Sequence, residues 1–177
     1  MPLVKAGRIV ADNFVRVEDG APIPDNVPVL IPAARFLADA DELAKREAPT
    51  GVIWPNDKNV AELAPHLEKL ALVALVFPTF KDGRAYSQAR LLRERYQFRG
   101  ELRATGNVLR DQFVFMLRAG FDSFDVVKEA DARAFEDVAK RYSVFFAPTG
   151  DGRVVVARER INRLAQDGKA KTQRVRA

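Results

Sequence analysis

The chain has no cysteine among its 177 residues and a single histidine, His66. The lack of cysteine excludes disulfides, cysteine-ligated zinc, iron–sulfur clusters and thiol chemistry from these residues. Without a second histidine, His66 is interpreted as a packed or surface residue rather than a metal ligand or general base. No GxGxxG or Walker sequence is present, so a nucleotide site of the usual kind is not expected. A redox role would therefore need a borrowed cofactor or a protein partner.

Long apolar runs are also missing. No stretch approaches the roughly 18 apolar residues that span a membrane, and the N-terminus lacks the apolar core of a signal peptide. These absences predict a soluble, cytoplasmic protein without membrane attachment. Hydrophobic residues make up 47% of the composition, which is enough for one core in a chain of this length. We expect a single α/β domain over residues 1–157, with an N-terminal hairpin within residues 1–20.

The net charge of +5 is concentrated at one end of the chain. Residues 158–177 contain seven basic and two acidic side chains, a net charge of +5, so residues 1–157 sum to zero. A basic tail without aromatic residues is typical of a solvated, disordered segment. We expect no nucleic-acid binding and little contribution of this tail to folding, so that truncation after Leu164 leaves the melting temperature nearly unchanged. Salt-dependent retention on immobilised nucleic acid would test the first expectation.

Short apolar runs alternate with helical patterns after residue 28. This βα repeat predicts a mainly parallel sheet, either a partial (β/α) barrel or an open doubly wound fold. An N-terminal hairpin with strands over 8–10 and 14–17 is expected beside it. The expected strands are 29–31, 52–54, 72–77, 102–104, 121–127 and 144–146, and the expected helices are 33–47, a short one before residue 70, 84–96, 108–119 and 132–142.

Charged residues interrupt the strand at 102–104. Glu101 and Arg103 are two residues apart and share one face, and burying that face against a helix would isolate two charges. The strand therefore lies at an edge, or its polar face looks into a crevice or barrel interior, which favours the partial barrel. The open side of such a barrel would expose apolar surface, so we expect a homodimer.

Two strand-to-helix corners follow the strands at 72–77 and 102–104. If both strands are parallel, polar residues of the two corners gather on one rim at the carboxyl ends of the strands, where α/β folds place ligands. Two guanidinium groups can clamp an oxoanion in a bidentate way. We expect this rim to bind sulfite, sulfate, phosphate or a carboxylate. The rim residues are Lys81, Asp82, Arg84, Arg103, Thr105 and Asn107.

The same corners carry two motifs, FKDGRAYSQARLLR and GELRATGNVLRDQ. Together they resemble the signature of the DUF934 family of bacterial proteins, over roughly residues 28–150. The resemblance implies a role in sulfite reduction, because the family is labelled a probable oxidoreductase of that process, with sulfite reductase as an expected partner. It implies no particular chemistry. The family pattern usually has Asp where this chain has Asn107.

Three functions remain open: an accessory protein or enzyme of sulfite reduction, an acid/base enzyme on a small anionic substrate, and a non-catalytic scaffold. In the second, Arg84 and Arg103 clamp the anion and Asp82 or Asp111 is the base. Asp82 and Asn107 could instead cap helices or form turns, and Tyr86 could donate to a ligand or only pack on the sheet. Further candidate contacts within the motifs are Ser87, Gln88, Gly106 and Gln112.

Arg103 gives the sharpest expectation. A charged strand residue costs stability unless a partner or ligand compensates for it. Arg103→Met is therefore expected to leave folding intact while abolishing anion binding. The opposite result would make Arg103 a structural ion-pair partner, for example of Asp125.

Overall fold

The computed structural model describes residues 2–140, 145, 149, 155, 156, 160 and 161. For residues 136–140 only the backbone is considered. Apart from residues 160 and 161, the predicted basic tail lies outside the described residues. Of the predicted strand at 144–146 only Phe145 is described, and it forms an isolated parallel bridge with Val155.

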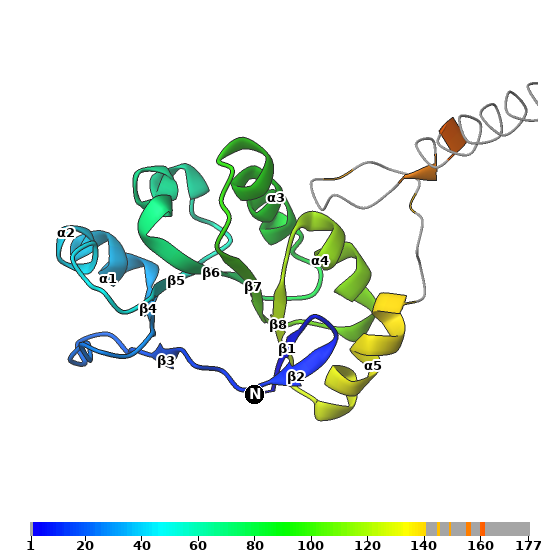
Figure 1. Cartoon of the computed structure of the whole chain (residues 1–177), viewed down its shortest axis with the longest axis horizontal. Helices are drawn as coiled ribbons and strands as arrows, with labels where there is room; N and C mark the ends of the chain where they lie inside the picture. The colour runs from blue at the N-terminus through cyan, green and yellow to red at the C-terminus, as the bar shows by residue number, and fades with distance from the viewer. Residues whose placement is uncertain (1, 141–144, 146–148, 150–154, 157–159, 162–177) are drawn as a thin grey trace, which may run out of the picture.

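The described elements follow the predicted alternation of strands and helices (Figure 1). The strands are β1 (Leu3–Lys5), β2 (Arg8–Val10), β3 (Val15–Arg16), β4 (Val29–Pro32), β5 (Thr50–Trp54), β6 (Leu70–Phe77), β7 (Glu101–Gly106) and β8 (Ser123–Asp125). The helices are α1 (Ala33–Ala38), α2 (Ala40–Leu43), the 3-10 helix η1 (Val60–Lys69), α3 (Arg84–Arg90), the π-helical turn η2 (Leu91–Arg95), the 3-10 turn η3 (Arg110–Gln112), α4 (Phe113–Ala119) and α5 (Glu129–Lys140).

The described strands form one eight-stranded sheet in the order β2-β1-β8-β7-β6-β5-β4-β3. All pairs from β3 to β8 are parallel, whereas β1 is antiparallel to both β2 and β8. The sheet curls into a half-barrel with the helices on its convex side (Figure 1). The mainly parallel sheet and the partial barrel were both predicted, and both are confirmed.

An N-terminal hairpin is present, but its strands differ from those predicted. Residues 8–10 pair with residues 3–5 through a two-residue turn at Ala6 and Gly7, whose φ angles of 50° and 77° suit a tight hairpin. The segment expected as the second strand, 14–17, instead forms β3 at the other end of the sheet, parallel to β4. The prediction missed the turn because Ala6 carries none of the usual signals for positive φ.

The two faces of the sheet differ in what covers them. The helices bury the main core, which includes Val73, Leu75 and Phe77 of β6. The concave face has only a small apolar cluster of Leu30, Leu72 and Ala74, against which Phe14 packs.

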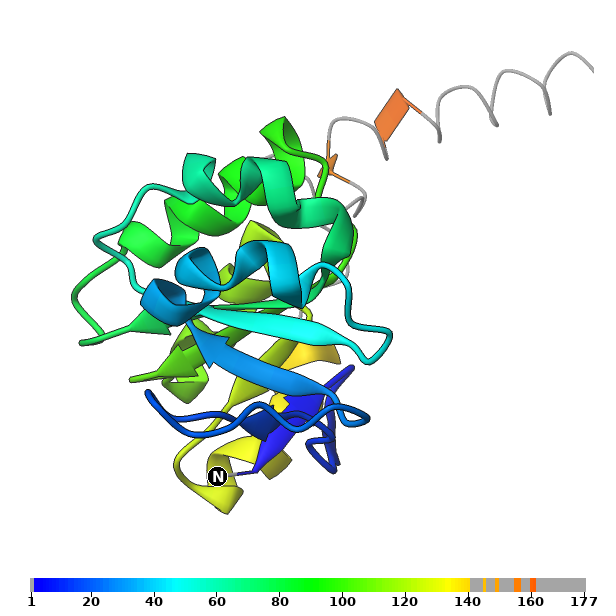
Figure 2. The same cartoon turned by 90° about the vertical axis from the view of Figure 1, so that its left-hand side faces the viewer.

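The segment between β2 and β3 runs along the open side of the half-barrel, from one end of the sheet to the other (Figures 1 and 2). This N-terminal segment, residues 11–16, thus occupies part of the side on which a dimer partner was expected. The homodimer itself stays a prediction.

Three of the predicted helices are wholly or partly 3-10 or π-helical, among them the one at 108–119, which begins with the 3-10 turn η3. Pro65 lies inside η1, which is a 3-10 helix, and a proline disfavours a continuous α-helix at this position because it has no backbone N–H and its ring clashes with the preceding turn. The helix expected at 84–96 changes from α to π at Leu91, whose carbonyl accepts from Tyr96 N at 3.0 Å. Among the described helices, none has the length and apolar character needed to cross a lipid bilayer.

Candidate functional site

The carboxyl ends of β5, β6 and β7 lead into three neighbouring loops, which form the rim predicted from the sequence. At its centre Asp82 and Arg84 form a two-pronged ion pair, with Nε 3.0 Å from Oδ1 and Nη2 2.7 Å from Oδ2. Asp82 also accepts from the Arg84 backbone amide at 3.2 Å. The carboxylate therefore both starts the helix and fixes the guanidinium of Arg84.

The ion pair determines the charge state of Asp82. Hydrogen bonds from the Arg84 side chain hold the pKa of the Asp82 carboxyl well below its usual range. Asp82 is thus ionised throughout the neutral range and is a poor general base. The side chain of Arg84 is 58% exposed, and Nη1 has no partner among the described residues. Lys81 precedes the pair, and its ammonium contacts the ring of Phe80 at 5.7 Å.

Two glutamines of the signature motifs hold the rim loops in place. Gln88 is buried, and its Nε2 donates to the carbonyls of Pro55 and Lys58 at 3.0 and 2.9 Å. Gln112 donates in the same way to the carbonyl of Phe80 at 3.1 Å. Each glutamine thus fixes the loop that follows a neighbouring strand. Both side chains bind backbone carbonyls of the rim loops.

The turn after β7 is built by close backbone packing. Gly106 has φ 91°, and a Cβ added there would lie 2.5 Å from the carbonyl oxygen of Phe77. The backbone N–H of Asn107 donates to the same oxygen at 2.7 Å. This turn therefore joins the ends of β6 and β7. The backbone N–H of Asn107 is already used in this bond and is not free to bind an anion.

A pocket of about 510 Å³ lies beside the rim, between α3 and α4. Residues of both signature motifs line it together with residues of α4. Tyr86 packs edge-on against Phe77, and burial, assisted by the negative charge of Asp111, raises the pKa of its hydroxyl to about 12. Tyr86 is therefore a hydrogen-bond donor at neutral pH, and packing and donation are compatible. The lining residues are Tyr86, Arg90, Asp111, Gln112, Phe115, Arg118, Ala119 and Thr149.

The remaining motif residues on α3 and η2 have separate surroundings. Ser87 is exposed and lines a shallow pocket of about 420 Å³ together with Arg90. Arg90 pairs with Glu94 one helical turn away, at 3.1 Å. Arg93 donates to the carbonyls of Phe98 and Gly100. These arginines thus have structural partners.

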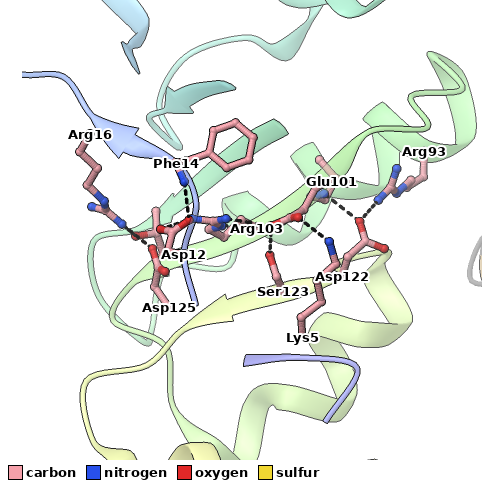
Figure 3. Close-up of polar contacts among 12 residues, drawn as sticks. Lys5, Asp12, Phe14, Arg16, Arg93, Glu101, Arg103, Asp122, Ser123 and Asp125 are labelled. Carbon is pink, nitrogen blue, oxygen red and sulfur yellow. Dashed lines mark hydrogen bonds and ion pairs between the residues drawn. The ribbon is translucent and has the colours of Figure 1, made fainter. Parts of the chain in front are cut away.

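Arg103 lies on the concave face of β7 and not on the rim (Figure 3). It is 1% exposed. Its Nη1 contacts Asp12 at 2.7 Å, and its Nη2 contacts Glu101 at 3.0 Å. The ring of Phe14 lies 5.7 Å from the guanidinium carbon. The structure therefore does not bring Arg103 together with Arg84, which starts a helix on the convex side, so the predicted two-arginine clamp is not assembled.

Two separate hydrogen-bonded clusters lie on the concave face, one around Arg103 and one around Arg16, and we call them together the concave network (Figure 3). Glu101 also accepts from Lys5 at 2.7 Å and from Ser123 at 2.6 Å. Three cationic and three anionic side chains balance within the network. Its members are Lys5, Asp12, Arg16, Glu101, Arg103, Thr105, Ser123 and Asp125.

Asp125, suggested from the sequence as a partner of Arg103, pairs instead with Arg16. Arg16 also reaches the hydroxyl of Thr105 at 3.5 Å, so Thr105 faces the concave side as well. Thr105 and Arg103 thus belong to the concave network. Of the predicted rim residues, Lys81, Asp82, Arg84 and Asn107 remain at the rim.

One rim residue was missed by the sequence reasoning. Asn56 follows β5 and is 8% exposed, and its buried side chain faces Asp82 and helps to lower the pKa of that carboxyl. A run of polar residues directly after a buried strand was the signal that could have identified it. No group of three or more His, Asp or Glu side chains in the described part of the chain is placed to hold a metal ion.

Comparison with known families gives one match. Residues 51–156 match the model of a family described as "Bacterial protein of unknown function (DUF934)". The chain belongs to the DUF934 family. The predicted resemblance is confirmed, although the matched region starts later than the expected residue 28. No curated protein is significantly similar to the chain.

The region matched by the DUF934 model includes all three rim loops and both signature motifs. Asp12, Phe14 and Arg16 lie outside it. In this chain the rim thus lies within the matched region, whereas the segment that crosses the concave face precedes that region.

Proposed function

We propose that this protein is an accessory component of sulfite reduction that binds a small oxoanion at the rim. The observation that carries the binding step is the ion pair of Asp82 with Arg84. It uses Nε and Nη2 of the guanidinium and leaves the exposed Nη1 directed away from the pair. The assignment to sulfite reduction is supported by the resemblance of the signature motifs.

A guanidinium that is already oriented loses little conformational entropy when it binds an anion. Asp82 reduces the positive charge, and Lys81 restores a net charge of +1 to the three residues, while the negative charge of Asp57 also acts on Arg84. The buried side chain of Asn56 supports the Asp82 carboxylate from within the rim. The rim therefore offers oriented donors of the kind that bind tetrahedral and pyramidal oxoanions.

The binding step is tested by calorimetric titration of sulfite, sulfate, phosphate and acetate at low ionic strength. Binding of at least one oxoanion, weakened by added salt, is expected. If none of the four anions gives a binding signal, the proposed oxoanion binding is wrong.

The accessory role is tested separately, by co-purification of the full chain with sulfite reductase. The chain has no cysteine and no nucleotide-binding motif, so the reducing equivalents would come from the partner. Retention of the reductase by the wild type, and its loss when residues 79–84 are replaced by a glycine-serine loop, is the expected result. Equal retention by both proteins would show that sulfite reductase binds a surface other than the rim.

A second candidate function is acid/base catalysis on a small organic anion in the pocket between α3 and α4. Asp111 is the base in this case, because the ion pair with Arg84 makes Asp82 unsuitable. The specific observation in its favour is the placement of Asp111 beside Tyr86, whose hydroxyl stays protonated. Exchange of a substrate C–H proton with deuterium, absent from Asp111→Asn, would support this reading.

A further inference from the structure

Three large hydrophobic side chains are exposed on the outer face of the helices beside the rim. Phe115 on α4 is 68% exposed, Phe80 in the loop after β6 is 51% exposed, and Leu91 at the start of η2 is 41% exposed. A soluble protein rarely exposes several large apolar side chains together unless they serve an interface. We call the surface formed by these three residues and the pocket between α3 and α4 the α3–α4 face.

The pocket between α3 and α4 connects the three exposed side chains. Phe115 itself lines this pocket of about 510 Å³. Gln112, also in the lining, donates to the backbone carbonyl of Phe80 at 3.1 Å. Arg90 lines both this pocket and the shallow pocket that contains Leu91. The exposed hydrophobic residues therefore border one continuous hollowed surface.

The same face carries charges of both signs, from different elements around the pocket. Arg90 belongs to α3, and Asp111 belongs to η3. The ion pair of Arg90 with Glu94 is exposed on both sides, so it adds little stability and leaves Arg90 available to a second carboxylate. Asp111 is exposed and forms no ion pair among the described residues.

These charges decide which kind of partner the face fits. A partner surface with charges of one sign would be repelled by either Arg90 or Asp111. A surface that carries one cation and one anion in the reverse order complements both. A second copy of the same face, turned by 180°, has this arrangement, because a twofold interface pairs each residue with its counterpart in both directions.

We propose that the α3–α4 face joins two copies of this chain in a twofold dimer. The axis passes close to Phe115, so that the ring of each copy enters the pocket of the other. Arg90 of each copy then faces Asp111 of the other copy. The helices that form this face lie on the convex side, away from the N-terminal segment that occupies part of the open side (Figure 1). A pocket filled in this way cannot also hold a substrate, so the dimer and acid/base catalysis in this pocket exclude one another.

Sedimentation of the full chain over a range of concentrations measures the dissociation constant of the dimer. Phe115→Glu should raise this constant at least tenfold, because it places two carboxylates near the axis. Val15→Glu is the matched control and should leave the constant unchanged, since Val15 is 48% exposed but lies on β3, away from α4 (Figure 1). A wild type that stays monomeric at high micromolar concentration would overturn the proposal. A dimer weakened by Val15→Glu and not by Phe115→Glu would also overturn it.

An exchange of charges tests the twofold pairing. Arg90→Asp and Asp111→Arg each place like charges opposite one another across the interface, so each should raise the dissociation constant at least tenfold. The double variant that carries both substitutions restores opposite charges and should return the constant to within threefold of the wild type. Recovery in the double variant cannot come from a loss of folding in the single variants. If the single variants dimerise as the wild type does, or if the double variant does not recover, the proposed interface is wrong.

Discussion

The guanidinium of Arg103 and the carboxylate of Asp12, 91 residues apart in the sequence, form an ion pair of 2.7 Å. The pair joins β7, in the middle of the sheet, to the segment that crosses the concave face. Arg103 is buried and also contacts Glu101, so its charge is compensated within the protein. Its position on a strand is thereby explained without a ligand.

Arg103→Met is expected to destabilise the protein by about 3–5 kcal/mol, because it leaves Asp12 and Glu101 without their shared cation. Urea unfolding of the variant and wild type measures the difference. Arg133→Met, which removes an exposed arginine paired with Glu129, is the matched control and should cost less than about 1 kcal/mol. A variant of Arg103 as stable as the wild type would contradict the structural role.

Stability should fall in acid because of Glu101. Burial alone would raise its pKa, but hydrogen bonds from Lys5 and Ser123 and the charge of Arg103 outweigh burial and lower it. A carboxyl whose folded pKa is depressed stabilises the fold above its unfolded pKa of about 4.3 and loses this contribution as pH falls through the folded value. Denaturant unfolding between pH 2.5 and 7 should show this loss. In Glu101→Gln the dependence on pH should be weaker, and an identical dependence would exclude Glu101 as its source.

Gly106→Ala should destabilise the turn between β7 and η3. The alanine would combine a strained φ of 91° with a clash against the Phe77 carbonyl oxygen. Gly20→Ala is the matched control, because Gly20 also has positive φ, 81°, but nothing lies within 4 Å of an added Cβ. We expect about 1–2 kcal/mol for the control and more for Gly106→Ala. Equal melting temperatures for the two variants would show that the contact with Phe77 is unimportant.

Gln88→Met should loosen the loop after β5, because the carbonyls of Pro55 and Lys58 both lose their donor. A cost of about 1–3 kcal/mol is expected. Faster amide hydrogen exchange in residues 55–59 is the specific measurement. Gln97→Met removes an exposed hydrogen bond to the carbonyl of Glu94, far from this loop, so it should leave exchange in residues 55–59 unchanged, and faster exchange there in both variants would argue against the proposed clamp.

The parallel sheet was predictable because hydrophobic runs and helical patterns alternate along the chain. The polar face of β7 was also predictable, since Glu101 and Arg103 are two residues apart and a strand places such residues on the same side. Their interpretation as a crevice or barrel interior follows from the cost of burying unpaired charges, and the half-barrel has this form.

The pairing of Arg103 with Asp12 could not be predicted. Asp12 lies in a segment whose pairing depends on a turn at Ala6 and Gly7, and alanine rarely adopts positive φ. Because the hairpin was predicted between the wrong strands, the segment that covers the concave face was not recognised. The buried roles of Gln88 and Gln112 were hidden for a similar reason, because both side chains bind backbone carbonyls that no sequence pattern marks.

The most direct test of the central claim is calorimetric titration of sulfite into wild type, Arg84→Met and Arg103→Met at low ionic strength, under conditions where each is folded. If the rim binds the oxoanion, wild type and Arg103→Met should bind with similar affinity, whereas Arg84→Met should lose at least tenfold. Arg133→Met should behave as the wild type. Unchanged binding by Arg84→Met would contradict the account, and loss of binding in Arg103→Met would place the anion site on the concave face.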